Sequence, residues 1–206
     1  VVLFLLGALQ GAIGWIMVAS GLEGDAVYVK PTRLALHFIF AMGLLAYTYW
    51  FALSLKVSPI EKNSVSAEAQ YKLLSIRKWA WVIITILCIQ LIYGALMAGH
   101  KAANVASTWP TINGALVPDG LTSKDSFILN AVNNTIWIHF VHRGLAYILL
   151  AVVLFWTIKM NKLSRNLFWS KIKMLPLFLV GVQVLLGVLT VLSSTSTVPG
   201  VWAKFE

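Results

Sequence analysis

The chain has 206 residues, of which 59% are hydrophobic and 11% charged, and its mean hydropathy is +0.83. This composition is too apolar for a soluble domain of this length and places the chain in a lipid bilayer. The net charge of +9 indicates nucleic-acid binding only where basic residues form one patch, and here they are spread over separate connections. Nucleic acid is therefore not an expected partner.

Five hydrophobic runs have about the 20 residues that a helix needs to cross the hydrocarbon core. They cover residues 1–19, 35–55, 80–99, 136–158 and 174–193. The first run lacks a basic leading region, contains Gln10 and precedes four further runs, so we interpret it as a membrane span and not as a signal peptide. The sequence predicts an all-α integral membrane protein with five transmembrane helices. Because the chain starts without Met inside a hydrophobic run, we expect it to be part of a longer protein.

Basic residues gather in two of the four connections between spans. They are Lys56, Lys62, Lys72, Arg77 and Lys78 after the second span, and Lys159, Lys162, Arg165, Lys171 and Lys173 after the fourth. The other two connections are balanced or poor in charge; they carry Glu23, Asp25, Lys30 and Arg33 after the first span, and Lys101, Asp119, Lys124 and Asp125 after the third. The positive-inside rule predicts that the basic connections face the cytoplasm or its equivalent and that the others face outward.

Three spans carry a glutamine followed four residues later by a glycine. The pairs are Gln10 with Gly14, Gln90 with Gly94, and Gln183 with Gly187. Each pair lies on one face of its helix. Ordinary packing of membrane helices explains each pair alone, because small residues allow close approach and an amide can bond across the interface. The longer similarity between residues 9–21 and 182–194 indicates a duplicated helical unit, in which counterparts of His37 and His142 would fall beyond the two ends of this chain.

All four histidines are predicted near the outer ends of the spans. His37 lies about one turn into the second span, His100 closes the third, and His139 and His142 lie in the first turns of the fourth. A ring nitrogen near hydrocarbon needs a hydrogen bond or a metal, so these residues are candidate haem ligands, with a satisfied packing histidine as the alternative. Of His139 and His142, which share one side of the helix, only one is needed, and His142 is favoured. His100, beside Lys101, is interpreted as an interfacial residue.

Two arginines stand beside the favoured histidines, Arg33 near His37 and Arg143 next to His142. Arginine near a membrane boundary commonly reaches toward the interface or anchors a loop. A guanidinium also binds a carboxylate bidentately, which suits the propionates of haem. Both interpretations stay open from the sequence.

Together these residues resemble haem A synthase, a membrane enzyme family of bacteria and mitochondria. The similarity extends over nearly the whole chain and rests on the order and spacing of several short motifs. They occupy residues 10–22, 31–37, 94–99, 109–114, 142–147 and 183–187.

The resemblance implies eight transmembrane helices in two pseudo-symmetric four-helix bundles, of which this chain supplies the third to seventh. Residues 1–55 would be the second half of the N-terminal bundle, residues 56–79 a cytoplasmic loop, and residues 80–206 most of the C-terminal bundle, with a long outer loop at about 100–135. It implies that His37 is an axial ligand of the substrate haem and His142 an axial ligand of a resident haem b. Their partner histidines and a catalytic acidic residue would lie outside this chain, which alone is expected to be inactive.

The implied reaction oxidises a methyl group of haem O to a formyl group and makes haem A for terminal oxidases. Implied partners are haem O, a haem O synthase and an electron donor, in a bacterial cytoplasmic membrane or alternatively the mitochondrial inner membrane; a homo-oligomer stays open. A di-haem b-type electron carrier would use the same histidines and leave the porphyrin unmodified. A transporter is disfavoured, because the spans carry almost no acidic residues and the histidines lie at one level.

Overall fold

A computed structural model describes residues 1–21, 28–56, 67–122, 126–163 and 173–194. Within these ranges the regular structure is helical, and β-type pairing is limited to one bridge between Ile112 and Ala115. The helices are α1 (Val2–Ala19), α2 (Pro31–Lys56), α3 (Ala67–Gly99), the 3-10 helix η2 (Ala102–Val105), α4 (Phe127–Asn133), α5 (Thr135–Leu163) and α7 (Leu175–Ser193). The prediction of an all-α chain is confirmed.

Five of these helices are long and apolar enough to cross a membrane. The membrane-spanning stretches are Val2–Ala19, Pro31–Lys56, Leu74–Gly99, Thr135–Asn161 and Leu175–Leu192, and they correspond to the five predicted spans. Helix α2 begins before the predicted start, at Pro31, because proline has no N–H to satisfy and is well tolerated in the first helical turn. Helix α3 also starts early, with Arg77 and Lys78 exposed before its most apolar part.

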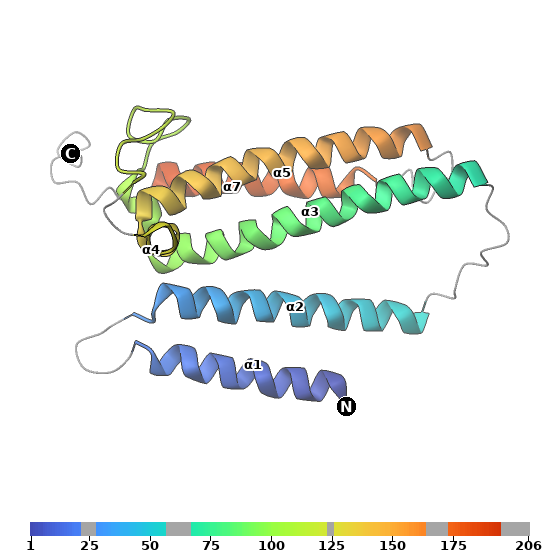
Figure 1. Cartoon of the computed structure of the whole chain (residues 1–206), viewed down its shortest axis with the longest axis horizontal. Helices are drawn as coiled ribbons and strands as arrows, with labels where there is room; N and C mark the ends of the chain where they lie inside the picture. Colours follow the sequence, from blue (N-terminus) through green and yellow to red (C-terminus); the bar gives the residue numbers. More distant parts are fainter. Residues whose placement is uncertain (22–27, 57–66, 123–125, 164–172, 195–206) are drawn as a thin grey trace.

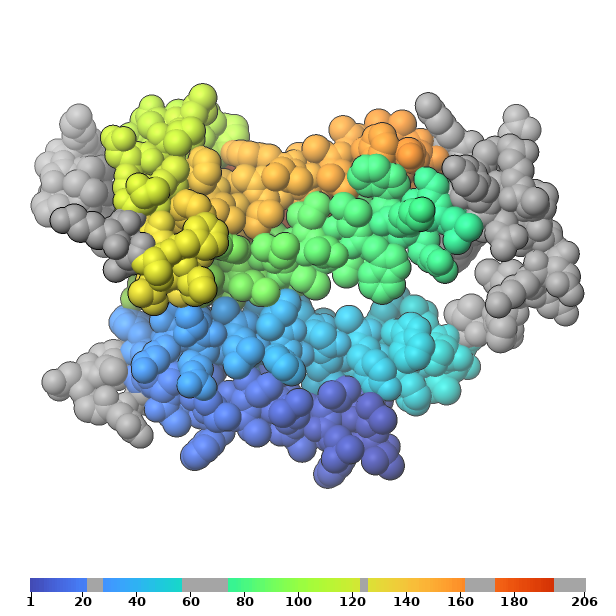
Figure 2. Space-filling view, in the orientation of Figure 1, coloured from blue at the N-terminus to red at the C-terminus, as the bar shows by residue number. Residues whose placement is uncertain are grey.

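The long helices run side by side and alternate in direction (Figure 1). Helix α1 packs on α2, α2 on α3, α3 on α5, and α5 on α7. In the space-filling view the α1–α2 pair lies along α3, with α5 on the far side of α3 (Figure 2). Helices α2 and α5 begin at the same end of the bundle, where α1, α3 and α7 finish; following the predicted orientation, we name this the outer end.

The membrane orientation itself stays a prediction. Several of the charged residues on which it rests lie outside the described ranges: Glu23, Asp25, Lys62, Lys124, Asp125, Arg165 and Lys171. The helix ends that flank the two basic connections, α2 with α3 and α5 with α7, do lie together at the end opposite the outer end (Figure 1). The alternation of basic and charge-poor connections therefore matches the alternation of the helices.

One cluster of buried core residues sits where α2, α3 and α5 meet near the outer end. It consists of Ala35, Ala95, Leu96 and Ile138, with Phe38, Ile92, Tyr93 and Met97 packed against it. Alanines at this crossing let the helix backbones approach closely, as is usual between membrane helices. The close approach continues at the end of α3, where a Cβ added to Gly99 would lie 2.8 Å from Cβ of Pro31. This packing fixes α2 and α5 against α3.

The connection between α3 and α5 folds over the outer end. It contains η2, a turn with positive φ angles of 52° at Asn113 and 90° at Gly114, and the short helix α4. Asn134 closes it, since its Oδ1 accepts from the backbone N–H groups of Ile136 and Trp137 at 3.0 and 3.1 Å and caps α5. The turn at Asn113 and Gly114 lies in the part of the loop that contacts α5.

Candidate functional site

His37 on α2 lies against Gln10 on α1. The amide nitrogen Nε2 of Gln10 is 3.1 Å from His37 Nδ1 and 3.4 Å from its Nε2, and it also donates to the His37 backbone carbonyl at 3.1 Å. Because an amide nitrogen carries two hydrogens, it can serve the carbonyl and the ring together. One turn along α1, a Cβ added to Gly14 would lie 3.0 Å from His37 Cε1. Glycine therefore leaves the space that the imidazole ring occupies.

The same arrangement recurs between α3 and α5. Nε2 of Gln90 lies 3.3 Å from Nε2 of His142. A Cβ added to Gly94 would lie 3.3 Å from Cε1 of the same ring. A glutamine, the glycine four residues later and the histidine of the next long helix thus form one repeated contact. We name Gln10, Gly14 and His37 unit 1, and Gln90, Gly94 and His142 unit 2.

The two histidines lie at similar depth. At 1.5 Å per helical residue, His37 is about 9 Å and His142 about 10 Å along its helix from the first residue. Both helices begin at the outer end (Figure 1). The third glutamine and glycine pair, Gln183 and Gly187 on α7, has no such histidine in the described ranges: Gln183 is exposed, and a Cβ added to Gly187 would meet nothing within 4 Å.

Three buried polar atoms of the two units have no hydrogen-bond partner among the described residues: Nδ1 of His142 and Oε1 of Gln10 and Gln90. A buried polar atom left in this way costs about 1–3 kcal/mol. A metal-bound imidazole uses one nitrogen for the metal and has its ring oriented by a hydrogen bond at the other. His142, with one nitrogen beside an amide and the other without a partner, fits this pattern.

The described residues contain no group of three or more His, Cys, Asp or Glu side chains that could hold a metal ion. Haem differs, because the porphyrin supplies most of the ligands and the protein adds one or two axial side chains. Two histidines on different helices, each beside an amide, suit the axial positions of haem.

His139 has a different environment from His142. Its side chain is completely buried, and its Nε2 accepts a hydrogen bond of 3.0 Å from Nε of Arg143. Its Nδ1 is buried and finds no acceptor within the described ranges. The structure thus brings His142, and not His139, into the contact that His37 makes. The assignment of His142 as the ligand remains a prediction, and this geometry supports it.

Arg143 holds the loop between η2 and α4 against α5. Its Nη1 donates to the carbonyl of Thr111 at 3.1 Å, and its Nη2 donates to the carbonyls of Thr108 at 2.6 Å and Ala106 at 3.5 Å. Together with His139, the guanidinium has four acceptors. Arg143 therefore closes the outer end of α5 directly above unit 2.

A second contact joins the same loop to α5. Trp109 Nε1 donates to the hydroxyl of Tyr147 at 3.1 Å. Within the loop, Thr108 Oγ1 donates to the carbonyl of Thr111 and accepts from the backbone N–H of Asn113, both at 2.8 Å. The motifs at residues 109–114 and 142–147, which are far apart in the sequence, thus form one structural element.

The other two candidate residues lie apart from the units. His100 donates from Nε2 to the carbonyl of Val132 at 2.8 Å, which ties the end of α3 to α4. The interfacial role expected for His100 stays a prediction. Arg33 is exposed in the first turns of α2, at the outer end. Nearby, the Lys101 ammonium lies 3.8 Å above the ring of Tyr28 and lowers the pKa of its phenol by hydrogen bonding and by charge.

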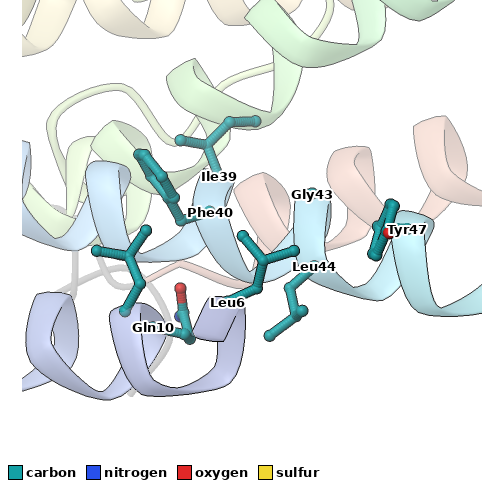
Figure 3. Close-up of a pocket in the computed structure, with 8 residues that line it drawn as sticks. Leu6, Gln10, Ile39, Phe40, Gly43, Leu44 and Tyr47 are labelled. Atoms are coloured by element: carbon teal, nitrogen blue, oxygen red, sulfur yellow. The ribbon is translucent and has the colours of Figure 1, made fainter. Parts of the chain in front are cut away.

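An apolar groove of about 340 Å³ adjoins unit 1. It is lined by Leu6, Leu9, Gln10, Ile39, Phe40, Gly43, Leu44 and Tyr47. In Figure 3 the side chains of α1 and α2 converge on it, with the amide of Gln10 at one side and Tyr47 at the other. Ligand pockets usually have this mixture of apolar walls and a few polar groups. The groove therefore gives an apolar ligand a place beside Gln10.

Comparison with known proteins agrees with this geometry. The family model described as cytochrome oxidase assembly protein matches residues 1–202. The chain belongs to this family. Curated relatives named heme A synthase include those of Bartonella henselae, 33% identical over 91% of this chain and 50% of the relative, and Novosphingobium aromaticivorans, 36% identical over 95% and 54%. No solved structure matches the chain significantly.

A third relative named heme A synthase, from Methylobacterium radiotolerans, is 41% identical over 72% of this chain and 38% of its own length. The chain thus spans about half the length of the curated relatives it matches, or less. Membership of the cytochrome oxidase assembly protein family, together with five helices able to cross a membrane, makes the chain an integral membrane protein. The resemblance to haem A synthase found in the sequence is confirmed.

The contacts of Gln10 and Gln90 were not predicted from the sequence. In the sequence both glutamines form part of a repeat, and helix packing is the expectation for each pair alone. A stronger signal was available, because in two of the three pairs the next span carries a histidine in its first turns. An amide and an imidazole on neighbouring membrane helices are expected to hydrogen-bond to each other, because the hydrocarbon provides no other hydrogen-bond partner.

Proposed function

We propose that the protein to which this chain belongs is a haem A synthase, which oxidises a methyl group of haem O to a formyl group and delivers haem A for terminal oxidases. The observation that carries the proposal is the pair of units in which a buried amide and a glycine hold a histidine on the next helix. Family membership supports the same activity.

We further propose that His37 holds the substrate haem and His142 a resident haem b. The groove beside Gln10 supports the first assignment, since its apolar lining suits a porphyrin. The loop clamped by Arg143 supports the second, since a haem that stays in place benefits from a closed site. Haem iron, when bound, supplies the redox chemistry of the reaction. The chain's own residues bind and orient the macrocycle and keep water away from it.

Arg33 and Arg143 are the proposed partners of the haem propionates. Arg33 is exposed at the outer end of α2, and its guanidinium has no hydrogen-bond partner among the described residues. Arg143 has five N–H groups, four of which have acceptors on His139 and the loop, so it can offer one to a propionate while the loop stays in place. Arg33 would therefore contribute a bidentate contact and Arg143 a single one.

The named relatives are bacterial, which supports a bacterial cytoplasmic membrane over the mitochondrial inner membrane. A haem O synthase would supply the substrate, and an electron donor would reduce the iron. The second axial ligands and the catalytic acidic residue are proposed to lie in parts of the protein beyond this chain, and the chain alone is proposed to be inactive.

The proposal is tested by extracting haem from membranes of cells that make haem O and express the intact protein. We expect haem A or its hydroxylated precursor with the wild type and neither with His37→Ala. Thr48→Val is a matched control on the same helix, because Thr48 is exposed and bonds only to Leu44 of its own helix among the described residues. Haem B and unconverted haem O in every sample would contradict the synthase and favour a di-haem electron carrier.

A further inference from the structure

Each unit contains a hydrogen-bond acceptor, Oε1 of its glutamine, that helix packing alone does not explain. In both, Nε2 of the glutamine is turned to the imidazole, while Oε1 is buried and has no partner in the described ranges. A glutamine present only to bring two helices together would bond to the backbone or to another amide of its neighbour. Gln10 also donates to the backbone carbonyl of His37, but both glutamines contact the ring of a candidate haem ligand, and this is true of two pairs of helices.

The chemistry of a metal-bound imidazole gives the unpartnered Oε1 of each glutamine a function. When one ring nitrogen binds iron, the other carries a proton and needs an acceptor. Without iron, one nitrogen of the neutral ring is an acceptor and needs a donor. A glutamine amide has a donor and an acceptor on the same carbon, so it can bond the ring in either state. An apolar side chain has neither a donor nor an acceptor, and a lysine has donors only, so neither can bond the ring in both states.

The glycine of each unit restricts the ring in a second way. The rings lie so close to α1 and α3 that a Cβ at Gly14 or Gly94 would come within 3.0 and 3.3 Å of Cε1. The imidazole therefore packs against the helix turn that carries the glycine. Steric contact with the glycine turn and a hydrogen bond from the amide together define one ring rotation.

We propose that Gln10 and Gln90 are positioning residues, whose amides hydrogen-bond the rings of His37 and His142 and fix their rotation. Nε2 of each amide faces the ring in this structure. With haem bound, the amide would turn so that Oε1 accepts from the ring N–H and raises the basicity of the ligand. This inference rests on the proposed binding of haem by these histidines. Partners of this kind commonly change metal affinity by about 10- to 100-fold when they are removed, because the ligand loses its orientation and part of its electron density. The same contact tunes the iron, since ligand basicity sets the reduction potential.

The test uses the intact protein purified with its haem, with Gln90→Leu and Gln90→Glu on α3. Gln90→Leu removes donor and acceptor, whereas Gln90→Glu keeps the length and an acceptor. Thr85→Val is the matched control, because Thr85 is exposed on the same helix and its hydroxyl donates to Trp81 of that helix. The readouts are the haem retained per protein, the low-spin electron paramagnetic resonance signal and the reduction potential.

We expect Gln90→Leu to weaken haem retention by about 10- to 100-fold and to raise the reduction potential, because the ring becomes less basic. Gln90→Glu is expected to retain haem and lower the potential, which keeps the test decisive if Gln90→Leu does not accumulate. Thr85→Val should match the wild type. The inference is overturned if both Gln90 variants give the resonance signal and potential of Thr85→Val. A separate variant, His142→Ala, distinguishes the two proposals: if it keeps the full haem content, haem ligation by His142 itself is wrong.

Discussion

Units 1 and 2 share their chemistry and differ in their surroundings. Helix α1 contributes a single buried hydrophobic residue, Ile13, and α2 likewise contributes only Ala35, in the part of the chain that is described. Helix α5 contributes Ile138, His139, Leu149, Val153, Thr157 and Met160. Unit 1 therefore stands beside an open apolar groove, whereas unit 2 lies in the best-packed part of the molecule, below a loop held by Arg143.

The difference indicates how one histidine arrangement can serve two roles. A substrate must enter and leave, so its site needs an open side with apolar walls. A resident cofactor is retained better where packing and hydrogen bonds close the site. The repeated units would supply the same ligand to both haems, and the surrounding helices and loop would decide which haem exchanges.

The largest effect is expected from removing either histidine. His142→Ala should eliminate the haem that survives purification, and His37→Ala should leave that haem in place while abolishing conversion of added haem O. The loss of haem affinity should exceed the 10- to 100-fold effect that is typical of mutating residues that hydrogen-bond a metal ligand. Haem content by absorbance and product analysis by chromatography measure the two separately. If the two variants lose the same haem, the assignment of different roles to the units is wrong.

The second-largest effect, a loss of stability, is expected from Arg143→Ala. This substitution removes the hydrogen bonds to His139 and to three loop carbonyls. Hydrogen bonds to a charged group contribute about 1.5–3 kcal/mol each and are not additive, so we expect a loss of about 3 kcal/mol of stability. Thermal unfolding in detergent measures it, and Arg77→Ala, exposed on α3, is the control. Unchanged stability, or haem loss from unit 2 that is no faster than in the wild type, would contradict the role of this loop.

Substitution of the two glycines should give a smaller effect that differs between the units. A Cβ would lie 3.0 Å from the ring in Gly14→Ala and 3.3 Å in Gly94→Ala, so the first ring must move further. We expect haem affinity to fall roughly tenfold for Gly14→Ala and less for Gly94→Ala. Gly11→Ala is the control on α1, because a Cβ there meets nothing within 4 Å. An equal response of Gly11→Ala and Gly14→Ala would show that the ring does not depend on the glycine.

The smallest effect is expected from Tyr147→Phe, which removes the acceptor for Trp109 and keeps the ring. One neutral hydrogen bond at an exposed position contributes about 1 kcal/mol or less. Thermal unfolding should therefore show a small decrease, with Tyr49→Phe as the control for an exposed tyrosine on α2. A decrease as large as that of Arg143→Ala would mean that Trp109, and not the guanidinium, holds the loop.

Much of the fold could be predicted from the sequence, because the length of an apolar run identifies a membrane-spanning helix. The exact ends were harder. Helix α3 begins at Ala67, well before the predicted start at residue 80, since hydrogen bonding inside a helix continues where the side chains become polar. Hydropathy detects the part in hydrocarbon, not the part that extends into water.

The candidate site was predicted in part for a related reason. His37 and His142 stood out because an imidazole inside an apolar run is costly. Their contacts with Gln10 and Gln90 depend on which faces of neighbouring helices meet, and spacing along one helix does not give this. Arg143 illustrates the same limit, because the sequence is compatible with both a loop anchor and a propionate partner. The loop contact depends on residues 106–111 lying beside α5, which the sequence does not indicate.

The most direct test of the account is a cryo-electron microscopy structure of the intact protein with its haem bound. The account predicts iron ligated by the ring of His142, and by the ring of His37 when substrate haem is present, with the amides of Gln90 and Gln10 hydrogen-bonded to those rings. Iron held by other residues, or rings of His37 and His142 turned away from both the iron and the glutamines, would contradict it.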